Sequence, residues 1–329
     1  MQIPIRENLV RCNSIKAWIL AARPKTLTAA SVPVMIGCAC AWDMLSQNAS
    51  ASAVDKMELM DPAFRFGILS NGFNWLAALL CMLFAFVMQI DANFVNDYFD
   101  CIKGKDNEER LGPERACQQG WVTLNAMRWA IGITSVIACF IGLPLILYGG
   151  YQLIIVGAAC LLFCFLYTTC LAGMALGDVL VLLFFGIVPC VFTTYVIVPP
   201  ELQVWHSMPW LMGTATGLVV DTLLIVNNYR DIDNDRSVGK KTLIVFIGRK
   251  AAEWLYMTVV PLALCIVLCL YGFTSINLIL TFAVYFFHIQ TCNKMRLIRK
   301  GRALNKVLGM TARNIFLYGI LITLLIILR

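Results

Sequence analysis

Nine apolar stretches run through this sequence of 329 residues, each near the ~20 residues that a helix needs to cross a bilayer. Backbone polar groups in lipid must be hydrogen-bonded within the segment, so stretches of this length are expected to be helices. Charged residues make up only 14% of the chain, too few to surround a soluble protein of this size. We therefore predict an all-α, polytopic membrane protein that forms a single domain over residues 1–329. The stretches lie at about 17–42, 74–97, 124–148, 151–171, 178–198, 208–229, 252–272, 274–293 and 311–328.

The distribution of basic residues predicts how the chain is oriented. If the N-terminus and the loops after spans two, four, six and eight share one side, that side holds 23 of the 26 Lys and Arg. Only Lys56, Arg65 and Arg329 are left on the other side. The positive-inside rule makes the basic side cytoplasmic. The net charge of +7 therefore reports topology, and nucleic acid is not expected as a partner. Residues 3–15 lack an apolar core, so no cleavable signal is expected there.

Spans two and six end in a repeated polar motif, within the stretches 89–106 and 220–243. The first copy, 95–100, reads V-N-D-Y-F-D, and the second, 226–231, reads V-N-N-Y-R-D, so Asp100 corresponds to Asp231. Asp235 follows Asp231 by four residues and is predicted to share its helix face. If the first helix continues, one face is predicted to carry Asn93, Asn96, Asp97 and Asp100.

Carboxylate and amide oxygens gathered in this way suit a hard divalent cation. Mg²⁺ in particular usually completes its shell with phosphate, and two metal-bearing clusters would bridge a diphosphate naturally. A single cluster is equally compatible with the polar end of a transmembrane helix. A matched pair favours the metal site, because acids near hydrocarbon cost roughly 2.5 kcal/mol or more each at depth. Asp91 and Asp221 lie within spans two and six, where they either extend the clusters or bond to neighbouring helices.

Basic residues near these motifs are candidates for anion binding, although each also fits a topological role. Arg23 and Lys25 flank a proline that interrupts the first span, and either of them is a candidate for an anionic substrate group. In the loop after the first motif, Arg115 and Arg110 suit bidentate binding of phosphate oxygens.

Two further candidates lie near the other cytoplasmic span ends. Lys240 and Lys241 follow the second motif and suit a diphosphate as point charges, but the spacing of a nucleotide P-loop is absent. Tyr167 ends span four, as an interfacial anchor or as a ring whose face stabilises a carbocation. Neither histidine has a ligand partner at helical spacing and most cysteines lie in apolar spans, so zinc is not expected.

Taken together, motifs in separate spans resemble the UbiA superfamily of membrane prenyltransferases. Within it, the chain is most similar to the dihydroxynaphthoate polyprenyltransferases of menaquinone synthesis, over roughly residues 16–328. The motifs are Arg23-Pro24-Lys25-Thr26-Leu27, Asn96-Asp97-x-x-Asp100 with Gly104-x-Asp106, Arg110-x-Gly112-Pro113-x-Arg115-Ala116, Gly177-Asp178, and Asn228-x-Arg230-Asp231-x-x-x-Asp235 with Gly239-x-x-Thr242-Leu243.

The resemblance implies a nine-helix bundle around a central pocket that opens toward membrane lipid. It further implies a prokaryotic plasma-membrane enzyme with a cytoplasmic active site, in which Mg²⁺ binds polyprenyl diphosphate and the allylic cation prenylates an aromatic acid. With dihydroxynaphthoate, CO₂ is lost. The residues carried over are Asn96, Asp97, Asp100, Asp106, Asp231 and Asp235 for metal, and Arg115, Lys240 and Lys241 for diphosphate. With the candidates read from the sequence itself, the predicted site also includes Arg110 for diphosphate, Asp100, Asp231 and Tyr167 for catalysis, and Arg23 and Lys25 for the acceptor.

Alternatives remain open at this point. Span four ends in Tyr167-Thr168-Thr169-Cys170 where relatives often have Tyr-Thr-Gly-Gly, so 4-hydroxybenzoate, homogentisate and haem remain alternative acceptors. A secondary transporter also fits internal repeats and intramembrane acids, but its acids tend to lie at the midplane in broken helices. A non-catalytic scaffold is the third alternative.

Overall fold

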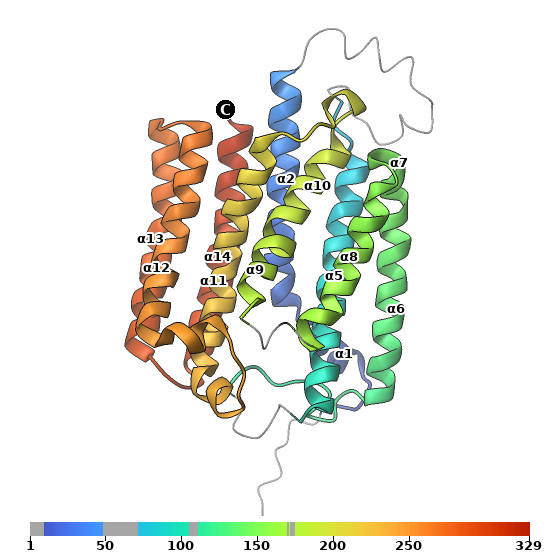
Figure 1. Ribbon diagram of the computed structural model, residues 1–329, viewed down its shortest axis with the longest axis vertical. Coiled ribbons are helices and arrows are strands. Elements are labelled where there is room, and N and C mark those ends of the chain that lie inside the picture. Colours follow the sequence, from blue (N-terminus) through green and yellow to red (C-terminus); the bar gives the residue numbers. More distant parts are fainter. Residues whose placement is uncertain (1–9, 49–71, 105–110, 170, 172–174) are drawn as a thin grey trace, which may run out of the picture.

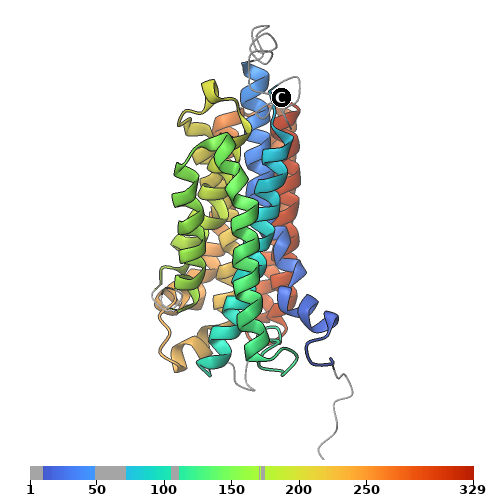
Figure 2. The same cartoon turned by 90° about the vertical axis from the view of Figure 1, so that its right-hand side faces the viewer.

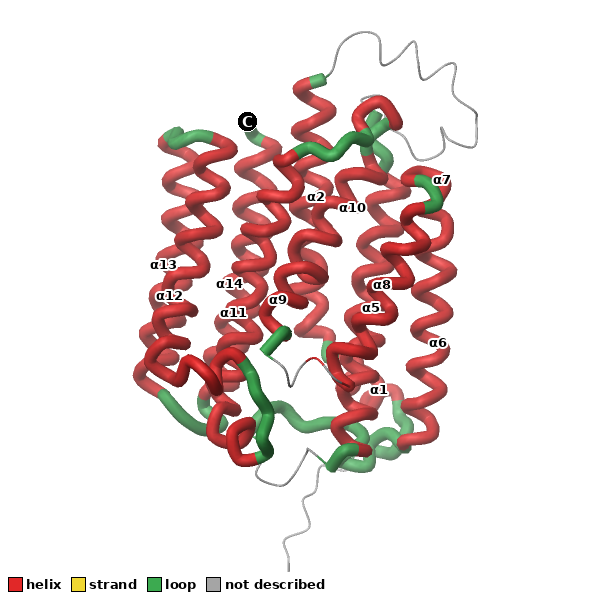
Figure 3. The backbone as a smooth tube through the Cα atoms, viewed as in Figure 1, coloured by secondary structure: helices red, strands yellow, loops and turns green. Residues whose placement is uncertain are grey.

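The structure is a computed structural model that describes residues 10–48, 72–104, 111–169, 171 and 175–329. Within these ranges every regular element is a helix (Figure 3). The main helices are α1 (Ile15–Ala22), α2 (Leu27–Gln47), α5 (Trp75–Ile102), α6 (Leu124–Gly142), α7 (Ile146–Gly149), α8 (Gln152–Thr169), α9 (Gly177–Leu182), α10 (Val188–Ile197), α11 (Ser207–Ser237), α12 (Leu243–Tyr271), α13 (Ser275–Ile298) and α14 (Leu304–Ile327). Short 3₁₀ or π turns are η1 (Pro24–Thr26), η2 (Leu143–Leu145), η4 (Leu183–Ile187) and η5 (Pro200–Leu202).

Nine helical segments in the described ranges are long and apolar enough to cross a membrane, which confirms the prediction. Several continue beyond the apolar runs from which they were predicted. In particular, α5 reaches Ile102 and α11 reaches Ser237. Residues after an apolar run still form helix when no Gly or Pro interrupts it, so both polar motifs lie on helical extensions.

The spans alternate in direction and form a single bundle (Figures 1 and 2). Helices α5 and α11 run the same way, and both end at the lower end of the bundle in Figure 1. Helix α11 packs against α12, α2, α14 and the α9–η4 segment, whereas α5 packs against α6, α2, α8 and α10. The two polar motifs, far apart in sequence, therefore reach the same end of the molecule.

Small residues bring the α9–η4–α10 span close to α11. A Cβ on Gly186 would lie 2.5 Å from both the Gly217 Cα and the Gly213 carbonyl oxygen of α11. Lipid provides no hydrophobic force between helices, so close backbone packing of this kind is a main source of their association. The contact holds η4 directly against α11.

The first span is broken where the sequence places its proline. Arg23 adopts a left-handed conformation with φ 50° between α1 and η1, which leaves carbonyls without their usual helical donors. Asn93 of α5 repairs the break, because its Nδ2 donates to the Ala22 carbonyl and to Thr26 Oγ1, both at 2.9 Å. The break therefore docks on α5 at a defined position.

Candidate active site

A cavity of about 1170 Å³ lies in the middle of the bundle. Its walls come from α2, α5, α6, α8, α9–α10 and α11. The lining is polar where α5 and α11 end, and apolar toward the other end, where Leu145, Leu153 and Val196 contribute. A chamber of this shape suits a long apolar ligand with a charged head.

The first polar motif places Asn96 and Asp100 on the cavity wall. Asn96 Oδ1 accepts a hydrogen bond of 2.6 Å from Thr168 Oγ1 of α8. The Asp100 carboxylate forms an ion pair with Arg115 at 2.5 Å, and Arg115 also lines the cavity. Lys103, one turn further on, lines the cavity and donates to the Thr169 carbonyl at 2.8 Å.

Asp97 differs from its prediction as a metal ligand. It is fully buried and is not among the residues that line the cavity. Its two carboxylate oxygens accept the backbone N–H groups of Ala116 and Cys117, at 2.9 and 3.1 Å. Burial, and then the nearby Asp97 charge, raise the pKa of the Cys117 thiol, which stays protonated. Asp97 therefore anchors the loop that carries Arg115, and its placement does not support a metal-binding role.

The second motif lines the opposite wall with Asp231 and Asp235. Asp235 is buried and forms an ion pair with Lys240 at 3.4 Å. The cavity is also lined here by three amides that were not predicted as site residues: Asn227, Asn228 and Asn234. Asn227 could have been predicted from the repeat, because it occupies in the second copy the position that Asn96 occupies in the first.

Arg230 holds this motif in place from behind. It is 2% exposed, and its Nε and Nη2 donate to the two carboxylate oxygens of Asp231 at 2.8 and 2.6 Å. Its Nη1 donates to Asn305 Oδ1, and Asn305 in turn donates to the Leu111 carbonyl, both at 2.8 Å. A fork of this kind orients the Asp231 carboxylate and ties the end of α11 to α14 and to the loop after α5.

The remaining basic candidates divide between the cavity and the surface. Arg23 and Lys240 line the cavity. Lys25 and Lys241 are exposed and do not line it, so their placement does not support roles in substrate binding. Asp106 and Arg110 lie outside the described residues.

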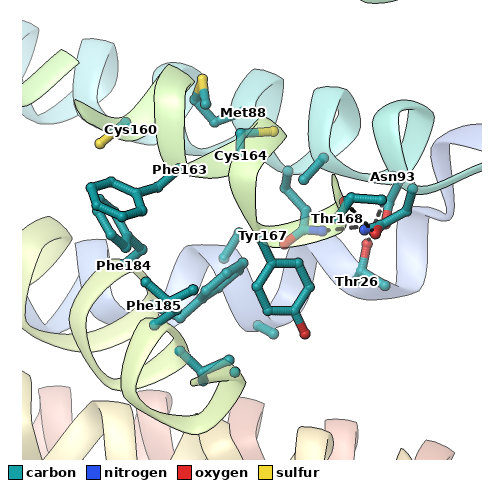
Figure 4. Close-up of a pocket in the computed structure, with 18 of the residues that line it drawn as sticks. Thr26, Met88, Asn93, Cys160, Phe163, Cys164, Tyr167, Thr168, Phe184 and Phe185 are labelled. Carbon is teal, nitrogen blue, oxygen red and sulfur yellow. Dashed lines mark hydrogen bonds between the residues drawn. The ribbon is translucent and has the colours of Figure 1, made fainter. Parts of the chain in front are cut away.

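Tyr167 lies on the cavity wall and not at the lipid surface. Figure 4 shows it projecting from α8 into the cavity, near Phe163, Phe184 and Phe185. The Phe163 and Phe184 rings pack at a centroid distance of 4.9 Å. Aromatic faces carry negative charge density, so this wall suits a positively charged or electron-poor carbon.

The two acids inside the spans behave differently. Asp91 bonds to a neighbouring helix, because it accepts from Thr134 Oγ1 at 2.5 Å and Ser135 Oγ at 3.0 Å, both on α6. This is one of the two roles left open by the sequence. Asp221 of α11 is 8% exposed, and its Oδ1 has no hydrogen-bond partner among the described residues.

No three His, Cys, Asp or Glu side chains within the described ranges gather closely enough to hold a metal ion by themselves. The donors on the cavity wall are instead carboxylate and amide oxygens divided between two helix ends. Such oxygens match Mg²⁺, which is commonly bound through one or two carboxylates together with substrate phosphates.

A family model described as the UbiA prenyltransferase family matches residues 66–320. The chain belongs to this family. As a UbiA family protein it is a membrane-embedded transferase of prenyl groups. It is 32% identical over 249 residues to 1,4-dihydroxy-2-naphthoate octaprenyltransferase from Escherichia coli (strain K12), an alignment that covers 72% of this chain and 70% of the relative.

Solved structures show the same fold for this UbiA family chain. An apo UbiA homologue from Aeropyrum pernix K1 superimposes with a TM-score of 0.62 at 16% identity, covering 91% of this chain and 97% of that one. A UbiA homologue from Archaeoglobus fulgidus, bound to DMAPP and Mg²⁺, gives a TM-score of 0.57 at 12% identity, covering 93% and 99%. The chain therefore shares its overall fold with these two UbiA homologues.

Proposed function

We propose that this chain transfers a polyprenyl group from polyprenyl diphosphate to 1,4-dihydroxy-2-naphthoate, with loss of diphosphate and CO₂, to give demethylmenaquinone. One observation carries the proposal. Asn96 and Asp100 of α5 and Asp231 and Asp235 of α11 line one end of a single cavity whose other walls are apolar and aromatic. A single ligand with a charged head and a long apolar tail needs a cavity with one polar end and apolar walls.

The oxygen donors on the two helix ends fit Mg²⁺ shared with a diphosphate. We infer that Asn96, Asp100, Asp231 and Asp235 would hold it, with Asp106 as a further proposed ligand. Mg²⁺ bound to the A. fulgidus homologue supports this inference. When bound, the metal would neutralise charge that grows on the departing diphosphate.

Basic side chains on the same wall would bind the diphosphate oxygens. Arg115 and Lys240 are placed for this, each already paired with an acid of one motif. Lys103, which also lines this end, would add a point charge. Arg110 stays a proposed contact from the adjacent loop.

The chemistry follows from the walls of the cavity. The allylic C–O bond breaks and its electron pair leaves with the diphosphate. The ring carbon that bears the carboxylate then forms a C–C bond to the cation, and the C–CO₂ bond breaks, which returns its electron pair to the ring. Tyr167 presents an aromatic face to the cation, and the apolar chamber excludes the water that would quench it.

The name of the E. coli relative favours dihydroxynaphthoate among aromatic acceptors. The acceptor's carboxylate would meet Arg23, the basic residue of the broken first span that lines the cavity. The distribution of Lys and Arg supports a cytoplasmic active site. The bacterial relative from E. coli supports a prokaryotic plasma membrane as the location.

An assay of the purified protein in lipid vesicles tests the proposal. Labelled polyprenyl diphosphate is supplied with 1,4-dihydroxy-2-naphthoate, 4-hydroxybenzoate or homogentisate, with Mg²⁺ or with EDTA. We expect prenylated product and released CO₂ and diphosphate only with dihydroxynaphthoate and Mg²⁺. Transfer to another acceptor would change the assigned substrate, and cation-coupled solute uptake without diphosphate release would overturn the enzyme assignment.

A further inference from the structure

A second pair of acids, separate from the two polar motifs, borders Tyr167. Asp178 lies in the first turn of α9 and lines the cavity. Asp221 lies on α11 and is 8% exposed. In each residue the Oδ1 atom is buried and has no hydrogen-bond partner within the described part of the chain. Buried acceptors left unpaired are costly and call for a ligand or a function.

Packing at the start of α9 shows where these acids face. A Cβ on Gly177 would lie 3.3 Å from Leu224 Cδ2 and 3.8 Å from the Tyr167 hydroxyl oxygen. The start of α9 is therefore held between Tyr167 and α11. Asp221 precedes Leu224 by three residues and shares its helix face. Asp178 and Asp221 are close enough to interact electrostatically with each other and with Tyr167.

We propose that Asp178, backed by Asp221, accepts a hydrogen bond from a ring hydroxyl of the aromatic acceptor. This inference rests on the proposed function and assigns the polar contact that selects a hydroxylated ring. A hydroxyl group supplies the donor that the orphaned oxygen lacks. A metal ion fits less well, because only one of the two acids lines the cavity. The same negative charge turns the acceptor's own carboxylate away, toward Arg23.

The contact also gives the hydroxyl proton a route during the reaction. When the C–C bond forms beside the hydroxyl-bearing carbon, positive charge develops on that oxygen and its proton passes to Asp178, which leaves a ketone. When CO₂ departs, the electron pair of the broken C–C bond moves to the ketone oxygen, which takes the proton back. The cycle consumes no net proton and needs no further reactant.

Calorimetric titration of two unreactive ligands tests the contact without requiring turnover. 1-Hydroxy-2-naphthoate can donate the hydrogen bond, whereas 1-methoxy-2-naphthoate cannot. Hydrogen bonds to charged groups are strong enough that the wild-type protein should bind the hydroxy ligand about tenfold or more tightly than the methoxy ligand. In Asp178→Ala the two affinities should fall within about twofold of each other. The isosteric Asp178→Asn, which keeps a neutral acceptor and the packing, should give an intermediate ratio.

Asp91→Asn is the matched control, because it neutralises a buried acid that bonds to α6 and does not line the cavity. It should keep the wild-type ratio. Binding of polyprenyl diphosphate with Mg²⁺ should be unchanged in all variants. An unchanged ratio in both Asp178 variants, or a loss of diphosphate binding instead, would overturn the assignment. Failure of the wild-type protein to prenylate any aromatic acid would instead refute the proposed function.

Discussion

At the scale of single residues, two acids three positions apart on α5 have opposite surroundings. Asp100 faces the cavity and pairs with Arg115, while Asp97 is buried beneath the loop that supplies Arg115. The pairs Asp100–Arg115 and Asp231–Arg230 also mean that two of the proposed metal ligands are charge-balanced by guanidinium groups. Paired acids of this kind are tolerated near the membrane at lower cost than isolated ones.

Substitution of these two acids should separate loop anchoring from chemistry. Asp97→Asn retains one acceptor oxygen but turns an amide N–H₂ toward a backbone N–H. We expect it to destabilise the protein by about 1–3 kcal/mol and to raise KM for polyprenyl diphosphate while the Mg²⁺ dependence stays the same. Asp100→Asn should fold normally and lose transfer by about 10²-fold or more. Thermal unfolding and steady-state kinetics distinguish them, and a higher Mg²⁺ requirement in Asp97→Asn would restore it as a ligand.

Removal of the buried guanidinium should have a large effect on stability. Arg230→Met leaves Asp231 without its ion-pair partner and Asn305 without a donor. Because the Asp231 side chain is 23% exposed, solvent partly screens the charge left without a partner, and we expect a loss of about 1–3 kcal/mol in the free energy of unfolding. Arg236→Met, on an exposed position of the same helix, is the control and should change stability little. Equal melting temperatures for the two variants would contradict the assigned network.

At the scale of elements, the loop after α5 acts as a strap across the end of the bundle. Its described part is held at Leu111 by Asn305 of α14, at Ala116 and Cys117 by Asp97 of α5, and at Trp121 by the backbone N–H of Asn13. Three attachments fix the position of Arg115 between them. The described part of this loop is therefore held by side chains from α14 and α5 and by the backbone of the segment before α1.

The contact between η4 and α11 gives a prediction with a matched control. Gly186→Ala would drive a Cβ to 2.5 Å from the α11 backbone, which cannot yield without the helices separating. We expect a loss of about 1–3 kcal/mol, as for other overpacked sites. Gly157→Ala on α8, where an added Cβ meets no atom within 4 Å, should be neutral or slightly stabilising. Thermal unfolding in detergent measures both, and a neutral Gly186→Ala would argue against the close packing.

At the scale of the whole molecule, the two motifs line the same end of one cavity because α5 and α11 are parallel (Figure 1). Each helix delivers its polar extension to the lower end of the bundle in Figure 1, and the C-terminus lies at the other end. Polar groups concentrate at one end of the cavity and apolar groups line the rest. This polarity suits an amphiphilic ligand whose charged head lies at the polar end of the cavity and whose tail lies along the apolar walls.

Reporter fusions test the orientation of this polarity. In a bacterial host, alkaline phosphatase fused after Arg329 should be active and green fluorescent protein fused there should be dark, because the positive-inside rule places that end outside. The same reporters inserted at Gly301, in the basic turn between α13 and α14, should give the opposite results. Reversed signals at both sites would place the active site on the outer face.

The sequence by itself determined the number of spans, their helical nature and the polar ends of spans two and six. These follow from the length of apolar runs and from local spacing, which tertiary contacts do not alter. Only the tertiary structure decided which acid faces the cavity. Asp97 lies about 100° around the helix from Asn96, at the edge of the predicted face, and its burial depends on a loop 19 residues away. The exposure of Lys25 and Lys241 and the hydrogen bond from Arg230 to Asn305 could not be predicted either. They depend on how each segment is rotated and on partners distant in the sequence, which the local pattern does not encode.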